Sequence, residues 1–316
     1  ELINDKLSNS QVNILCLSLG GGSGAGSCET MVELLLETGK PLVVMTILPM
    51  ISEDAKAKSN ALVTLDKLTT FARDKTISNL IVIDNAKLES IYADVSQMDF
   101  FNIANKAIVN TLDVFNTLSM MPSPGKPLDS MEFSKILLDG EGITVYGELT
   151  VENYEDEVAI ADAIISNLSG NLLAGGFNLK QAKYVGYMIA ANKKVWDKIP
   201  LSSIGYANSM IDDLCGTPTN IFKGEYVVDN QEDSVKIYSI FSGLGLPESR
   251  INQLQVDTKE LQAKSKIKDE SRNLTLKIDT GKDEIVSAAD KIKQKIAAKS
   301  SNFGKFVSGT VDRRKP

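Results

Sequence analysis

Five glycines within seven residues form the segment of this sequence best suited to chemistry. They lie between an apolar run at residues 12–19 and a helical pattern at residues 27–38. Glycines let backbone amides approach a ligand without obstruction by a Cβ atom, and a helix N-terminus adds partial positive charge. The two features favour a phosphate-binding site over a merely tight turn. We call this segment the glycine loop; its residues are Gly20, Gly21, Gly22, Ser23, Gly24, Ala25 and Gly26.

Composition narrows the chemistry that the side chains can supply. The chain has no histidine, which excludes serine and cysteine triads with a histidine base and most transition-metal sites. Its three cysteines, Cys16, Cys28 and Cys215, have no paired spacing, so the sequence predicts neither a disulfide framework nor a zinc site. Catalysis would therefore depend on carboxylates, hydroxyls, lysines or a bound cofactor.

The 316 residues have an ordinary globular composition, with 43% hydrophobic and 24% charged residues, and this length suits roughly two domains. No run approaches the ~18 apolar residues that a membrane-spanning helix needs. The first residues lack the basic start and the small-residue cleavage site of a signal peptide. We therefore expect a cytoplasmic protein without a membrane partner.

The elements that must position the glycine loop alternate between strand and helix. After the loop, the sequence predicts a buried strand at residues 42–48, a helix at 53–71 and a further strand at 80–83. This alternation is typical of a Rossmann-type, doubly wound parallel sheet in an α/β protein. We therefore expect the glycine loop to connect a strand of such a sheet to a helix.

A long helix separates this half from the remainder. Apolar residues recur at mostly helical spacing through residues 99–121, and the pattern stops at Pro122 and Pro124. Beyond it, strand-like runs predict a second α+β domain; they are residues 143–149, 184–190, 220–228 and 235–241. A charged segment after residue 247 predicts a long exposed C-terminal helix and then a tail. The predicted domains are residues 1–98, 99–121, 122–248 and 249–316.

The glycine loop resembles the tubulin signature loop of the tubulin/FtsZ superfamily, written Gly-Gly-Gly-Thr-Gly-Ser/Thr/Ala-Gly. The one departure is Ser23, where threonine is usual and where serine keeps the hydroxyl group. In that family the loop holds the phosphates of GTP or GDP. The resemblance therefore implies that residues 20–26 bind the phosphates of GTP/GDP, with Mg²⁺ accompanying the nucleotide.

Two downstream segments extend the resemblance. Residues 83–88 (Ile-Asp-Asn-Ala-Lys-Leu) are similar to a family segment whose asparagine contacts the ribose or guanine, which implies this role for Asn85. The long helix resembles the family helix in which an aromatic ring stacks on guanine and an asparagine four residues later bonds its edge. Phe101 and Asn105 have that spacing, which places both on one helix face. An ordinary core aromatic is the alternative for Phe101, whereas an amide on the apolar face would need a polar partner.

Two acids three residues apart begin the next predicted helix. Residues 127–133 (Pro-Leu-Asp-Ser-Met-Glu-Phe) resemble the co-catalytic loop of the family, whose acids enter the nucleotide site of the next subunit and polarise the attacking water. The resemblance implies these catalytic roles for Asp129 and Glu132. Spacing alone favours helix capping, because acids at a helix start interact with the dipole and the free amides. Pro127 departs from the family, in which asparagine is common.

Further segments narrow the resemblance to TubZ, the tubulin relatives of plasmids and phages that move DNA. They include Asn105 followed by Lys106, and the run at residues 235–247 before a long charged helix. Several strands precede the signature strand in this superfamily, and the residues before residue 12 are too few to form them. The resemblance thus spans most of this chain and corresponds to the later part of a family member.

The resemblance implies a polymerising GTPase that forms head-to-tail filaments with itself and takes part in plasmid or phage DNA partition. Residues 257–316 hold 15 Lys/Arg against 9 Asp/Glu, a balance of +6, while the rest of the chain carries −13. Such a basic tail suits an interaction segment, with a solvated helix face as the alternative. In TubZ-like systems the tail meets a DNA-binding adaptor of the TubR type, so we expect that adaptor or DNA itself as a partner.

Other functions stay open. Gly20, Gly22 and Ala25 satisfy the loosest dinucleotide-binding Rossmann fingerprint, but residues 47–50 (Ile-Leu-Pro-Met) supply no acid to hold a ribose. No Gly-x-x-x-x-Gly-Lys-Ser/Thr run is present, which disfavours a P-loop NTPase. The non-enzymatic alternative is a structural filament or adaptor protein that keeps the fold and lacks turnover.

Overall fold

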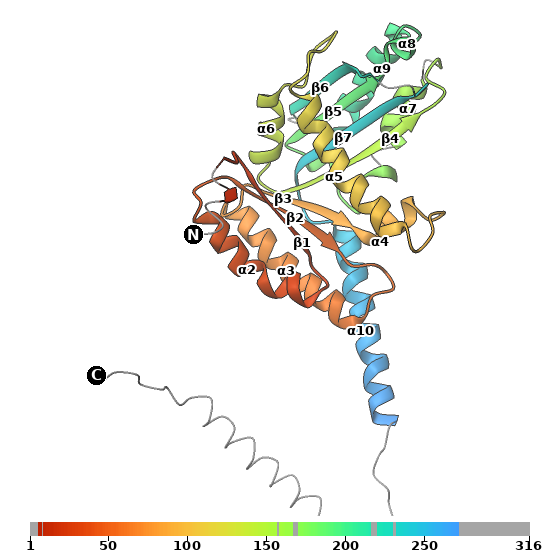
Figure 1. Ribbon diagram of the computed structural model, residues 1–316. Coiled ribbons are helices and arrows are strands. Elements are labelled where there is room, and N and C mark those ends of the chain that lie inside the picture. Colours follow the sequence, from red (N-terminus) through yellow and green to blue (C-terminus); the bar gives the residue numbers. More distant parts are fainter. Residues whose placement is uncertain are drawn as a thin grey trace, which may run out of the picture. The chain divides into compact units, whose positions relative to one another are not determined.

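The computed structural model describes residues 6–7, 9–156, 158–166, 170–215, 220–229 and 232–271 of the chain (Figure 1). Two units are distinguished, Glu1–Ser265 and Lys266–Pro316, and the strands and the candidate site all belong to the first. Most of the predicted basic tail lies outside the described residues. The predicted domain boundaries at residues 98, 121 and 248 remain a prediction.

Seven strands of the described residues form one mixed sheet (Figure 1). In spatial order they are β1 (Asn13–Ser18), β2 (Leu42–Leu48), β3 (Asn79–Asp84), β4 (Ile143–Val151), β7 (Val235–Leu244), β5 (Tyr184–Ala191) and β6 (Asn220–Val227). The first four strands pair in parallel, as do β5 and β6, whereas β7 runs antiparallel to both of its neighbours. The predicted α/β fold with a parallel sheet in its first half is therefore confirmed.

Helices cover both faces of the sheet. One face carries α2 (Gly22–Leu36), α3 (Ala55–Arg73), α7 (Ala159–Ser166) and α9 (Leu201–Cys215), and the other carries α4 (Asn85–Ile91), α5 (Phe100–Leu118) and α6 (Ser130–Leu138). Alternate residues of a strand enter the two layers, so that Val44 packs with the first set of helices and Val43 with the second. Two short elements, η2 (Leu179–Gln181) and α8 (Lys193–Trp196), flank β5.

The helix after the glycine loop begins earlier than its pattern predicts. α2 starts at Gly22, so much of the glycine loop forms its first turn, whereas the sequence predicted a start at residue 27. The difference has a physical cause, because glycine has low helix propensity and carries no side chain that would reveal a helical face. The glycine loop is therefore the N-terminus of a helix that follows β1 directly.

The last described helix, α10 (Glu248–Ser271), was predicted to be exposed, and this is wrong for its first half. Arg250, Leu254 and Thr258 recur every fourth residue and are 6%, 0% and 8% exposed. They form a stripe along one side of the helix, and Leu254 belongs to the core. None of the helices in the described part of the chain is long and apolar enough to cross a lipid bilayer.

A buried polar cluster joins the first three strands to the rest of the sheet. β3 and β4 pair through only two registered residue pairs, and next to them Asn79 donates from Nδ2 to the Leu137 carbonyl at 2.9 Å. The Thr144 hydroxyl contacts Asn79 Oδ1 at 2.8 Å and the Ser242 hydroxyl at 2.7 Å. These groups are buried, so each depends on the others for its hydrogen bonds.

We expect Asn79→Ala to lower the free energy of unfolding by roughly 2–4 kcal/mol. The substitution leaves the buried Leu137 carbonyl and Thr144 hydroxyl without their hydrogen bonds to Asn79. Asn110→Ala, at an exposed position of α5, is the matched control and should change stability by no more than about 0.5 kcal/mol. Urea unfolding of both variants measures the difference. Equal stability of the two variants would contradict the role given to the cluster.

Candidate functional site

The glycine loop leaves open space where a ligand could approach its backbone. Gly21 is the N-cap residue of α2 and supplies no side-chain hydrogen bond to the free amides of the first turn. A Cβ atom built on Gly21, Gly22 or Gly26 would meet no atom within 4 Å. The fold itself does not require glycine at these three positions, whereas an anion bound at a helix N-terminus needs this unobstructed backbone.

Gly24 differs from the other glycines of the loop because the fold requires it. A Cβ atom on Gly24 would lie 2.1 Å from the carbonyl oxygen of Ser18, the last residue of β1. Main chain packs on main chain here, which holds the N-terminus of α2 directly at the end of the strand.

The loop between β2 and α3 brings an acid to the glycine loop, which the sequence analysis missed. A Cβ atom on Gly20 would lie 2.9 Å from Glu53 Oε2, while Glu53 Oε1 accepts from the Met50 amide at 2.9 Å. Asn60 Nδ2 reaches the Gly20 carbonyl at 3.4 Å. Residues 47–50 at the end of the second strand include no acid, but Glu53 lies five residues after Leu48 and its side chain approaches Gly20. No spacing rule predicts such a return.

Asn85 lies at the same edge of the sheet as the glycine loop. It is half-buried and begins α4, whose N-cap residue Asp84 accepts from the Ala86 amide at 3.1 Å. Ser18 is registered with β2, and Leu48 is registered with Asp84, so the three parallel strands end together (Figure 1). The glycine loop, the Glu53 loop and Asn85 therefore line one carboxyl edge, where α/β proteins bind ligands.

Phe101 and Asn105 lie on the exposed side of α5. Phe101 is 55% exposed and contacts the buried Phe100 edge to face, with ring centroids 5.3 Å apart. The alternative that Phe101 is a core aromatic is therefore wrong. Asn105 is exposed as well, so it does not share the buried stripe that contains Ala104 and Ile108, contrary to the sequence analysis. A planar ring and an amide four residues apart remain free to contact a ligand.

Asp129 and Glu132 form a capping box at the start of α6. Asp129 Oδ1 accepts from the Glu132 amide at 2.8 Å, and Glu132 Oε2 accepts from the Asp129 amide at 3.4 Å. Lys126 Nζ lies 3.8 Å from Glu132 Oε1. The capping interpretation is therefore confirmed, and the carboxylate oxygens that the cap does not use remain available for a second role.

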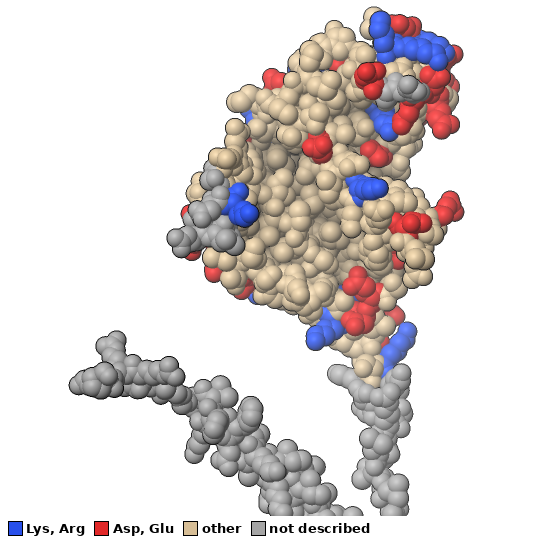
Figure 2. Space-filling view, in the orientation of Figure 1, with Lys and Arg blue, Asp and Glu red and all other residues tan. Residues whose placement is uncertain are grey.

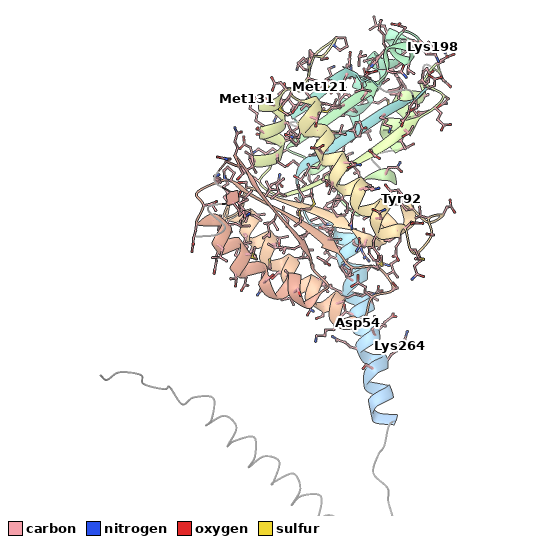
Figure 3. All side chains as sticks on the ribbon, viewed as in Figure 1. Asp54, Tyr92, Met121, Met131, Lys198 and Lys264 are labelled. Atoms are coloured by element: carbon pink, nitrogen blue, oxygen red, sulfur yellow. The ribbon has the colours of Figure 1, made fainter. Side chains whose placement is uncertain are left out.

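The two acids lie at the opposite end of α5 from its exposed aromatic ring. Phe133 of α6 stacks on Phe115 near the C-terminus of α5, with ring centroids 6.0 Å apart. The 19 residues of α5 span about 28 Å at 1.5 Å per residue. Figure 3 labels Tyr92, just before α5, at one end and Met121 and Met131 at the other. The acids and the exposed ring of Phe101 therefore lie at opposite ends of α5.

A large apolar groove lies away from the glycine loop. Its volume is about 570 Å³, and its lining includes Val12, Ile14 and Cys16, in or just before β1, Val109 of α5 and Met120, which follows α5. Figure 2 shows few charged side chains over the face that carries α5 and α6. The volume of this groove therefore gives no support to a site at the carboxyl edge. The evidence for that site is the chemistry of its residues.

The arrangement defines a class of protein. A parallel sheet with a glycine loop after β1, a long helix that crosses the sheet and a second half with antiparallel strands form a tubulin/FtsZ-like fold. A model of the C-terminal domain of the tubulin/FtsZ-like protein TubZ matches residues 113–255. The TubZ structure from Bacillus thuringiensis serovar israelensis, in a GTPγS-form protofilament, superposes with a TM-score of 0.72 at 20% identity, covering 83% of this chain and 68% of that one.

Curated relatives agree with the structural comparison. The tubulin-like protein CetZ of Pyrococcus abyssi is 26% identical, over 77% of this chain and 64% of its own length. TubZ of Bacillus cereus is 24% identical, over 72% of this chain and 56% of its own length. The chain has a tubulin/FtsZ-like fold and is similar to TubZ and CetZ, and these comparisons support the predicted resemblance to the tubulin/FtsZ superfamily. It spans a little over half the length of these two relatives.

The glycine loop yields a stability prediction. Gly24→Ala should destabilise the fold by about 1–3 kcal/mol, because the new methyl group overlaps the main chain of β1. Gly26→Ala should stabilise it by about 0.5–1 kcal/mol, since the position is helical and open. Thermal unfolding of the two variants without nucleotide measures both effects. The opposite order of stability would show that the loop packs differently.

Proposed function

We propose that the carboxyl edge of β1, β2 and β3 binds a guanine nucleotide and that the glycine loop holds its phosphates. One observation carries this proposal: Gly21 and Gly22, which the fold does not need, stand open at a helix N-terminus without a side-chain cap, and Gly26 is open one turn further along. Free amides and the helix dipole attract the phosphates, and the absence of Cβ atoms lets them approach the main chain.

The other residues of the edge suit the remainder of the nucleotide. Glu53 is an acceptor beside Gly20 and would bind ribose hydroxyls, and Asn85 would contact the ribose or the base. The exposed ring of Phe101 would stack on guanine, while Asn105 would bond its edge. Mg²⁺ would accompany the nucleotide, because its phosphate oxygens are ligands that Mg²⁺ prefers.

Hydrolysis would be completed between two subunits. Asp129 and Glu132 lie at the far end of α5 from the nucleotide edge, so they would meet the nucleotide of a neighbour in a head-to-tail contact. There they would orient and polarise the attacking water. A contact between different surfaces that does not close on itself builds a filament. A similar structure, TubZ of Bacillus thuringiensis, forms GTPγS-form protofilaments, which supports this geometry.

The wider role that we propose is DNA partition by a cytoplasmic filament. A TubZ of type III plasmid segregation has a similar fold, with a TM-score of 0.71 at 19% identity. In this role the basic residues 257–316 would bind a DNA-binding adaptor of the TubR type or DNA itself. Residues 272–316 of this segment lie outside the described residues. The expected binding to an adaptor or to DNA therefore rests on the net charge of the segment.

A filament protein without turnover is the second candidate, and the capping box favours it. Asp129 and Glu132 already have a structural purpose within their own subunit, which does not require catalysis. A dinucleotide is a further candidate ligand, because Glu53 lies close to Gly20 and Rossmann sites use an acid to bind the ribose. Thermal stabilisation by GTP but not by NAD would exclude the dinucleotide, and phosphate release measured against protein concentration would separate the two filament functions.

We expect Phe101→Ala to weaken GTP binding by about 1–3 kcal/mol, the usual contribution of one base stacked on an aromatic ring. Its stability should stay within about 0.5 kcal/mol, because the ring is largely exposed. Val109→Ala is the matched control, since Val109 is a 61% exposed hydrophobic residue on the same helix. Titration calorimetry with GTP compares them, and equal affinities would remove Phe101 from the site.

Hydrolysis by the acids is tested with variants that keep the helix cap. Asparagine is as good an N-cap as aspartate, and glutamine completes a capping box as glutamate does. Asp129→Asn and Glu132→Gln should therefore retain GTP affinity and fold stability but lose about 10²–10⁴-fold in turnover. Their filaments should persist after GTP addition in light scattering. Loss of GTP affinity by the monomeric variants would show that the acids act within their own subunit.

A further inference from the structure

Helix α10 is bound to the nucleotide edge by a buried arginine. Arg250 is 6% exposed and forms a bidentate ion pair with Asp84, from Nε to Oδ2 at 2.8 Å and from Nη2 to Oδ1 at 3.1 Å. Nη2 also donates to the Pro49 carbonyl at 2.8 Å. One guanidinium group thus holds the ends of two neighbouring strands, β2 and β3, at the edge where the glycine loop lies.

A second ion pair joins α10 to α3 about two turns further along α10, at Asp257. Lys58 of α3 is 2% exposed, and its Nζ lies 3.0 Å from Asp257 Oδ2 of α10 and 2.7 Å from the Ile51 carbonyl. Asp54, which caps α3 and is labelled in Figure 3, lines a hollow together with Leu261 of α10. Two ion pairs therefore connect α10 to the end of β3 and to α3, and the same two cations bond carbonyls of the loop between β2 and α3.

The anchored groups belong to the base and ribose side of the proposed site. Asp84 is bonded by Arg250 and at the same time caps α4, which begins with Asn85. The carbonyls of Pro49 and Ile51 belong to the loop that presents Glu53. Among the described residues, the hydrogen-bond partners of Arg250 and Lys58 do not include a residue of the glycine loop, which lies on the phosphate side.

We propose that Arg250 and Lys58 are positioning residues through which α10 sets the affinity of the site for the guanosine part of the nucleotide. This inference rests on the proposed function. Since Arg250 holds Asp84, which caps the helix that begins with Asn85, and Asn85 would contact the base, docking of α10 favours GTP over ATP. The coupling is reciprocal, so bound nucleotide also holds α10 against the sheet edge.

The environment of Asp84 supports the positioning role of Arg250. Burial raises the pKa of its carboxyl group, while the Arg250 guanidinium and the Ala86 amide act in the opposite direction. Removal of Arg250 would leave this carboxylate buried without its counter-ion, a state that drives local rearrangement. The rearrangement would begin at Asp84 and move the adjacent start of α4.

The ratio of GTP to ATP affinity tests the proposal, because a ratio does not depend on the folded fraction of a variant. Arg250→Met should reduce this ratio roughly tenfold, a typical coupling between linked sites, while ATP affinity stays unchanged. Arg250→Lys, which keeps the charge but not the bidentate geometry, should give an intermediate ratio. Lys194→Met, which removes the exposed ion pair with Asp233 on the other half of the sheet, should match the unmodified chain.

If Arg250→Met does not fold, a milder variant, Asp257→Asn, tests the same proposal. Asp257→Asn removes the second ion pair at a side chain that is 24% exposed, and it should lower the ratio in the same direction. Unchanged ratios in the folded variants, or equal losses for GTP and ATP, would overturn the proposal and leave the ion pairs a structural role. An unmodified chain that binds no GTP, or that binds ATP equally well, would instead refute the proposed function.

Discussion

Parallel pairing of β1, β2 and β3 is the constraint on which the rest of this structure depends. Because the strands share one direction and register, Ser18, Leu48 and Asp84 end at one edge, and each is followed by a connection that meets the others there. The contact between Gly24 and the Ser18 carbonyl then fixes the helix N-terminus at this edge. A phosphate cradle, an acid and an amide come together without being close in sequence.

The sequence predicted the elements better than their contacts. Strands buried on both faces, such as β2 and β3, are continuous apolar runs, and the glycine loop is distinctive in any context. The same reasoning could not place Glu53, whose return to Gly20 depends on the path of a loop, or the pair Arg250 and Asp84, which are 166 residues apart. Local patterns describe a residue's own element, whereas these contacts arise only when distant elements pack.

Helix α5 separates binding from catalysis in the account that we propose. Its first turn presents the exposed ring of Phe101, which would stack on the base, and Phe115 near its other end stacks on Phe133 of α6. A rigid helix of this length keeps the acids away from the nucleotide of the same subunit. Turnover would then require assembly. The charged contacts of α10 would add a second control, because they link the last described helix to the residues that recognise the base.

The central claim is that the open glycines bind the phosphates of a guanine nucleotide. The most direct measurement is an NMR titration of the glycine-labelled chain with GDP, and with ADP as the control, at concentrations where it is monomeric. The account predicts that the amides of Gly21, Gly22 and Gly26 shift with GDP at lower concentrations than with ADP, while those of Gly205 and Gly224, on the other half of the sheet, do not. Unshifted loop amides at saturating GDP, or equal responses to both nucleotides, would contradict it.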